Sequence, residues 1–291
     1  MTMLERYKSV QDHEEHLYDW FRGLFLKERM LSAEMMELML EAVEATANTR
    51  VDDQLLNVEE VEDLKQSADM LVAVRMFNDF EAAKLLILHG LPDQTYGLMR
   101  DAVECMMMMH LFHHDPERAK RWLTSLKEYS PGIVKSRLQE LDVELLEYDL
   151  YGTLSTLAHL NLLGSLATVA EVKVGESGVF RQHHFGGFRN EKWAARQFQF
   201  LLLLQYLALA TVFARTYGAY INDLGDWVQR VHRLLPNLQE LNVPINEEDS
   251  PDNATKYADP RLQEFITKRL RLKFEPYAPR TVGETLREEN A

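Results

Sequence analysis

Five polar residues recur at four-residue spacing within two segments of the chain that are otherwise apolar. Arg100 and Glu104 form one set, and Tyr151, Ser155 and His159 form the other. Because residues four apart share one face of an α-helix, each set would lie on one side of its helix. An unpaired charge among the neighbouring Leu, Met and Val residues would be costly, so we expect the two sets to meet. Such a cluster fits either an internal packing device or a catalytic or ligand-binding site, and both interpretations stay open.

Histidines gather at a second place, just before an Asp-Pro boundary. His110, His113, His114 and Asp115 lie within six residues, and imidazole is a ligand of Zn, Ni or Fe. Adjacent His113 and His114 point to different faces of a helix, however. The Glu-x-x-His motif of di-iron bundles is also absent from the chain. We therefore expect no metal and no other cofactor, and keep a helical metalloprotein as a third hypothesis.

Motifs that identify common enzyme classes are missing. The chain has no Gly-rich phosphate loop, no Gly-x-Ser-x-Gly elbow, no Cys-x-x-Cys and no His-Glu-x-x-His. Its single cysteine, Cys105, begins the apolar run 105–109, where a thiol is expected to pack rather than to act as a nucleophile. Whether the protein is an enzyme stays open on these grounds.

Composition bounds the partners and the location. The net charge of −14 opposes polyanions, which counts against nonspecific binding of nucleic acid. One cysteine permits no intramolecular disulfide, and no signal peptide is visible at the start of the chain, so we expect an acidic cytoplasmic protein. Residues 150–170 and 198–214 are nearly long and apolar enough to cross a membrane. Their polar residues favour core helices of a soluble protein instead.

The elements that position these residues are predicted to be helices. Hydrophobic periodicity predicts an all-α fold, a bundle of about eight helices with one minor β-hairpin. The hairpin is expected between residues 171 and 187, where two short β-prone runs flank the Gly-rich residues 175–178. Helices are expected over residues 3–28, 32–47, 58–89, 93–114, from 116 onward, 131–169 with a break near 148–152, 190–220 and 225–241.

The chain divides into two parts by composition. Residues 1–241 are predicted to form the helical bundle domain. Residues 242–291 are rich in Pro, Asn, Asp and Glu and are predicted to be a polar C-terminal tail with one short basic helix, near residues 260–274.

Two stretches resemble an uncharacterised prokaryotic family of all-helical proteins, a domain of unknown function. They are GLMRDAVECMMMMHLFHHDPERAKRWL and YGTLSTLAHLN. The resemblance covers about residues 85–170, and its pattern combines Arg-x-x-x-Glu, Asp-Pro-Glu and Tyr-x-x-x-Ser-x-x-x-His. The matching positions are Arg100, Glu104, Asp115, Pro116, Glu117, Tyr151, Ser155 and His159. The resemblance implies an all-helical fold and brings no established activity.

A more distant similarity connects the chain to abortive-infection and HEPN-type helical proteins, which include RNases with an Arg-x(4–6)-His motif. The sequence departs from that motif in the region of the resemblance, where nine residues separate Arg100 from His110. We therefore expect a helical binding or interaction protein that forms a homo-oligomer such as a dimer and can bind a protein partner. The alternative is an RNase or toxin-type effector of host defence.

Overall fold

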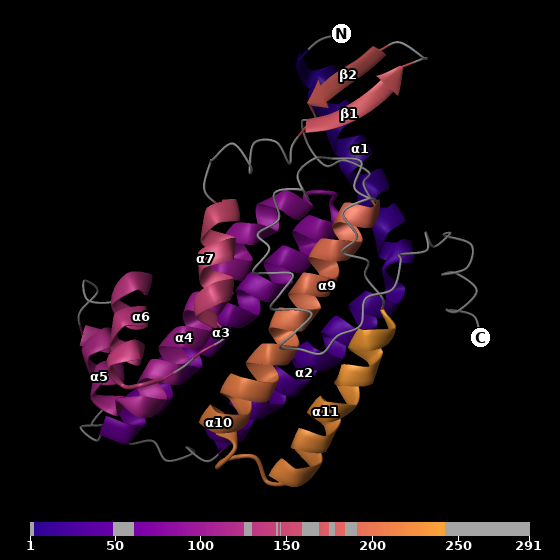
Figure 1. Ribbon diagram of the computed structural model, residues 1–291. Coiled ribbons are helices and arrows are strands. Elements are labelled where there is room, and N and C mark those ends of the chain that lie inside the picture. Colours follow the sequence, from indigo (N-terminus) through magenta and orange to yellow (C-terminus); the bar gives the residue numbers. More distant parts are fainter. Residues whose placement is uncertain are drawn as a thin grey trace.

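The computed structural model describes residues 3–48, 61–124, 130–143, 145, 147–158, 169–174, 178–183 and 191–241. Within them the chain is predominantly helical, which confirms the predicted all-α class (Figure 1). The predicted tail, residues 242–291, and His159 lie outside the described residues.

The first half of the chain contributes the long helices. α1 (Met3–Leu24) is followed after one residue by α2 (Leu26–Asn48), and α3 (Val61–Leu88) leads through a short 3₁₀ helix (Pro92–Gln94) to α4 (Thr95–His114). Gly90 ends the α3 segment with a positive φ of 72°, a conformation that suits glycine. Ser32 was predicted to cap a helix, but it lies inside α2 and is buried.

Shorter helices follow. α5 (Pro116–Thr124) and α6 (Pro131–Glu140) begin at the two prolines, as predicted from their place at a first helical position. The break predicted near residues 148–152 is wrong, because α6 already ends at Glu140 and α7 (Glu147–Ala158) is continuous through that stretch. Asp142 stands in the break with a φ of 58°, a left-handed conformation that an aspartate tolerates better than most residues.

The last helices form one long continuous helix followed by an antiparallel one. α9 (Glu191–Leu207) runs into a π-helical segment, η3 (Ala208–Phe213), and then into α10 (Ala214–Tyr217), before α11 (Leu224–Glu240) folds back. Asp223 caps α11 by accepting a hydrogen bond from the Asp226 backbone N–H at 2.9 Å.

Strands β1 (Val169–Val174) and β2 (Gly178–His183) pair antiparallel, with Val172 opposite Phe180. Residues 175–177, which would form the turn between them, lie outside the described residues. The predicted hairpin therefore stays a prediction.

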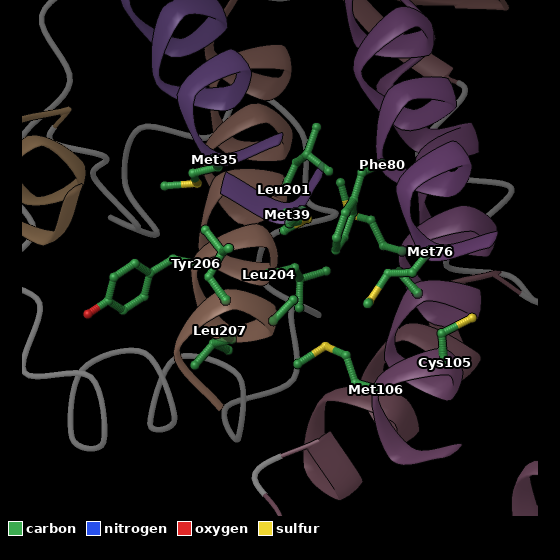
Figure 2. Packing of buried hydrophobic residues seen from close by; sticks show 14 of the residues in the cluster. Met35, Met39, Met76, Phe80, Cys105, Met106, Leu201, Leu204, Tyr206 and Leu207 are labelled. Carbon is green, nitrogen blue, oxygen red and sulfur yellow. The ribbon is translucent and has the colours of Figure 1, made fainter. Parts of the chain in front are cut away.

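The helices pack around one continuous apolar core. α3 packs on α4, which in turn contacts α7, while α2 contacts α9 and α11 on the other side. Figure 2 shows Met39 of α2, Met76 of α3 and Met106 of α4 around Leu204 of α9. Methionine side chains are unbranched and adapt to irregular spaces, so the Met-rich run of α4 serves as core, as its sequence suggested.

Among the described residues, one helix, Ala194–Tyr217, is long and apolar enough to cross a membrane by length and composition alone. Within its most apolar window, 72% is buried against the rest of the protein. Gln205, inside that helix, is fully buried and donates a hydrogen bond to Ser32 of α2 at 3.2 Å. Such burial favours the predicted core helix, and the absence of a membrane span stays a prediction.

Candidate functional site

Four of the five residues predicted to cluster do come together, where α4 packs on α7. Arg100 Nε lies 3.4 Å from Glu104 Oε1. The Tyr151 hydroxyl donates to the Glu104 carboxylate, and Ser155 donates to Tyr151. The cluster was expected to point into the core, but the side chains of Arg100 and Glu104 are 26% and 20% exposed. The helices place this group at the edge of the core because Arg and Glu are long enough to reach solvent.

Three further residues, Arg75, Asp79 and Asp101, join this group, and the helical spacing did not indicate them. Asp101 accepts from Arg100 Nη2 at 3.1 Å through one carboxylate oxygen and from Arg75 Nη2 at 3.2 Å through the other. Arg75 belongs to α3, so Asp101 ties α3 to α4. We call Arg75, Asp79, Arg100, Asp101, Glu104, Tyr151 and Ser155 the α4–α7 polar cluster.

The cluster holds more carboxyl groups than guanidinium groups. Asp79 of α3 is half-buried, and its Oδ2 has no hydrogen-bond partner among the described residues. Burial, and then the charge of Asp101, raise the pKa of Asp79 to about 6 from 3.8, although Arg75 opposes the shift. Burial and Asp101 also raise the pKa of Glu104, against the opposing charges of Arg100 and Arg75. Both carboxyl groups would therefore gain from an additional positive partner.

Cys105 lies beside this cluster in sequence, but its thiol belongs to the core. Its side chain is buried, and burial raises the pKa of the thiol to about 12. A thiol with such a pKa stays protonated and is a poor nucleophile. The structure thus agrees with the expected packing role.

A second group of polar residues lies near the other end of α4. His110 Nε2 is 3.2 Å from Glu147 Oε1 on α7, and His110 Nδ1 is 3.3 Å from Arg215 Nη1 on α10. A guanidinium group only donates hydrogen bonds, so Nδ1 accepts and the ring hydrogen is on Nε2, which donates to Glu147. His110 is therefore a neutral imidazole between a carboxylate and a guanidinium. The side chains of His110 and Glu147 are nearly completely buried, whereas Arg215 is exposed.

The π-helical segment η3 brings a further polar group to Glu147. The Thr211 hydroxyl donates to the Leu207 carbonyl at 2.8 Å and lies 3.5 Å from Glu147 Oε1. In η3 the backbone N–H of Ala214 bonds to the Leu209 carbonyl, five residues earlier. A π-turn inserts one residue into a helix and so changes the direction of the side chains that follow, and such turns are frequent at functional sites. Arg215 follows this turn directly.

The remaining histidines and Asp115 do not complete a metal site. His113 and His114 are exposed, with their rings edge-to-face and 5.3 Å between centroids. Asp115 pairs with Arg118 at 3.2 Å. Within the described part of the chain, no three His, Cys, Asp or Glu side chains could hold a metal ion together. We call His110, His113, His114, Glu147 and Arg215 the histidine cluster.

α3 also contributes a buried ion pair. Lys65 Nζ lies 2.8 Å from Asp69 Oδ2, with side chains only 10% and 1% exposed. The Tyr217 hydroxyl is buried and has no hydrogen-bond partner among the described residues. Burial, and then the charge of Asp69, raise the pKa of Tyr217 well above its usual value.

Comparison with known proteins gives no match: no family model, no curated protein and no solved structure is significantly similar to the chain. The resemblance to a domain of unknown function, and the distant similarity to HEPN-type proteins, therefore stay predictions. Arg6 and His13 do stand at an RNase-like spacing of six intervening residues, outside the region of that resemblance. Their side chains lie outside the described part of the structure.

Proposed function

We propose that the chain is a helical binding protein whose α4–α7 polar cluster binds a small ligand carrying an amino group. The observation that carries this proposal is Asp79 Oδ2, a buried carboxylate oxygen with no hydrogen-bond partner among the described residues. Buried polar atoms in native proteins are nearly always hydrogen-bonded, and an exception needs an explanation. A ligand that donates a hydrogen bond to Asp79 supplies one.

The charges of the cluster favour an amine over an anion. Asp79, Asp101 and Glu104 supply three carboxyl groups against the two guanidinium groups of Arg75 and Arg100, and both guanidinium groups already form ion pairs with Asp101. The pKa values of Asp79 and Glu104 are raised. A cation beside them would lower both pKa values, because an opposite charge stabilises the ionised carboxylate.

The nature of the site also favours an organic amine over a bare metal ion, because no described set of three ligand side chains could hold one. An ammonium group has three N–H donors and no acceptor, so it would pair with carboxylate oxygens such as Asp79 Oδ2. Because Asp79 is half-buried, solvent screens its charge less than it would at an open surface.

A panel of probes tests this function. Putrescine is the diamine probe and glutarate the matched dicarboxylate, each titrated calorimetrically into the full chain at pH 7.5 and constant ionic strength. The expected result is saturable binding of the diamine alone, which Asp79→Asn weakens. Asp19→Asn, at an exposed carboxyl group of α1, is the matched control and leaves binding unchanged. Diamine binding that Asp79→Asn does not alter, or no binding of the diamine, contradicts the proposal.

Other expectations from the sequence are part of the same proposal. β1 and β2 form a hairpin, the protein is cytoplasmic, and it assembles as a homo-oligomer such as a dimer. Light scattering coupled to size exclusion measures the assembly. The RNase-type alternative stays a prediction that incubation with labelled RNA decides.

A further inference from the structure

We propose that Arg215, together with His113 and His114, forms a second site, and that this site binds a phosphate group. It lies at the C-terminal end of α4, whereas the α4–α7 polar cluster lies nearer the start of that helix. Its ligand has the opposite charge, so the two proposals can fail independently.

The first support is that one nitrogen of the Arg215 guanidinium is hydrogen-bonded within the protein, while the side chain is exposed to solvent. Its Nη1 donates to His110, which is fixed in turn by the buried Glu147. The side chain is nevertheless exposed, and no described carboxylate forms an ion pair with it. A guanidinium has five N–H donors in a planar fork that matches the oxygens of phosphate, so several donors remain for a ligand.

The second support is the pair of histidines beside it. His113 and His114 are exposed in the last turn of α4. The charge of Arg215 acts on both rings and, after burial, is the largest cause of their lowered pKa values. His113 and His114 follow His110 by three and four residues on α4, and Arg215 Nη1 lies 3.3 Å from His110 Nδ1, so the guanidinium and the two exposed rings lie near one another. A phosphate placed there could accept hydrogen bonds from all three side chains, because a neutral imidazole keeps one N–H donor.

The third support is the backbone of η3. A π-helical turn interrupts the regular hydrogen bonding of a helix, and such turns are frequent at functional sites. Here the insertion places Thr211 against Glu147 and Arg215 against His110, on the same helix and one turn apart. Arg215 is thus positioned by three elements, α4, α7 and η3, before any ligand arrives, and such preorganisation lowers the entropy cost of binding.

The overall charge decides between two sources of phosphate. A net charge of −14 repels a nucleic acid, which brings many phosphates, more strongly than a small phosphate compound that brings one. The proposal therefore commits to free phosphate or a small phosphomonoester.

The test is a titration of the full chain, in a phosphate-free buffer of constant ionic strength. The probes are inorganic phosphate and a single-stranded ten-nucleotide DNA without terminal phosphates. Saturable binding of inorganic phosphate is expected, weakened at least about tenfold by Arg215→Gln, which corresponds to the loss of one charge-assisted contact. The matched control is Arg230→Gln. Arg230 lies on α11 and pairs with Glu41 of α2 and Asp226 of α11, so this change should alter the affinity less than about twofold.

Further arms separate a positioning role from a structural one. Glu147→Leu should weaken phosphate binding through Arg215, while Glu147→Gln, which keeps an acceptor for His110, should restore most of it. If a variant does not fold, the wild-type protein still gives an answer by NMR. Ring signals of His113 and His114 should shift on addition of phosphate, and that of His232 on α11 should not. Unchanged histidine signals, equal losses in Arg215→Gln and Arg230→Gln, or binding of the oligonucleotide without inorganic phosphate would each overturn the proposal.

Discussion

His110 donates its Nε2 hydrogen to Glu147 at 3.2 Å, and the two side chains are only 2% and 5% exposed. The pair joins α4 to α7 across 37 residues of sequence. Because Arg215 donates to the other ring nitrogen, the imidazole cannot rotate without losing both contacts. The hydrogen bond between His110 and Glu147 therefore both joins α4 to α7 and fixes the ring that orients Arg215.

Removing the carboxylate should destabilise the protein measurably. Glu147→Ala leaves the buried His110 Nε2–H without its acceptor, and we expect a loss of about 2–3 kcal/mol in the free energy of unfolding. Glu147→Gln keeps an acceptor oxygen and should lose less. Asp149→Ala, at the exposed carboxyl group two residues later, should stay within about 0.5 kcal/mol. Urea denaturation compares the variants, and equal losses for Glu147→Ala and Asp149→Ala would show that the bond contributes nothing.

Glu104→Ala tests the degree of burial at the α4–α7 polar cluster. A fully buried pair would lose about 3–5 kcal/mol and an exposed pair about 0–1 kcal/mol. With 26% and 20% exposure of Arg100 and Glu104, and with Asp101 still bound to Arg100, we expect about 1–2 kcal/mol. Chemical denaturation gives the value. A loss of about 3–5 kcal/mol would instead mean that Asp101 does not compensate the charge of Arg100 once Glu104 is removed.

The sequence predicted the α4–α7 contact well because its signal is local. Four-residue spacing places Arg100 with Glu104, and Tyr151 with Ser155, and two helices with polar residues on an apolar face have a strong reason to meet. Asp101 was missed for the same reason. A rule based on helix faces omits Asp101, because it follows Arg100 directly in the sequence and would lie on another face. The side chains of Arg75 and Arg100 are nevertheless long enough to reach the Asp101 carboxylate.

The histidine cluster was predictable only in part. His110, His113 and His114 were noticed as possible metal ligands, but Glu147 and Arg215 lie 37 and 105 residues away from His110. Their contact depends on the packing of three helices. It also depends on the π-turn of η3, and no sequence pattern in residues 208–213 indicates an inserted residue. The prediction that Ser32 caps a helix was wrong for another reason. Serine is a good capping residue, but Ser32 is buried inside α2 and accepts a hydrogen bond from Gln205.

Asp79→Asn should stabilise the protein at neutral pH. The pKa of Asp79 is raised to about 6, so the folded state holds this proton more tightly than the unfolded state does. The wild type therefore loses stability as pH rises from the ordinary aspartate pKa to about 6, and stays lower above it. After allowance for solvent screening of a half-exposed group, we expect a gain of ~1 kcal/mol at pH 7.5. Thermal unfolding across pH measures it, and a gain that persists unchanged in acid would mean that ionisation of Asp79 is not its cause.

Cys105 should resist thiol reagents in the folded protein. The side chain is 1% exposed and its pKa is raised by burial to about 12, so both access and thiolate are lacking. Labelling with a disulfide reagent at pH 8 should proceed at the rate of unfolding and become fast in denaturant. Rapid stoichiometric labelling without denaturant would place the thiol at an accessible surface.

His113 and His114 should make the protein less stable in mild acid. The pKa of each is lowered from 6.5, first by burial and then by Arg215, so below that pH the unfolded chain binds protons that the folded chain does not. The contribution of these histidines to the free energy of unfolding is therefore fully present above pH 6.5. It is lost as the pH falls from 6.5 through the lowered pKa values of the folded protein. The loss should be smaller in a His113→Gln, His114→Gln double variant. Arg215→Gln should raise both pKa values, measured from histidine ring signals by NMR in phosphate-free buffer, while the His232 signal serves as the internal control. Values that do not move in Arg215→Gln would mean that burial alone lowers them, and that the guanidinium is not held near the two rings in solution.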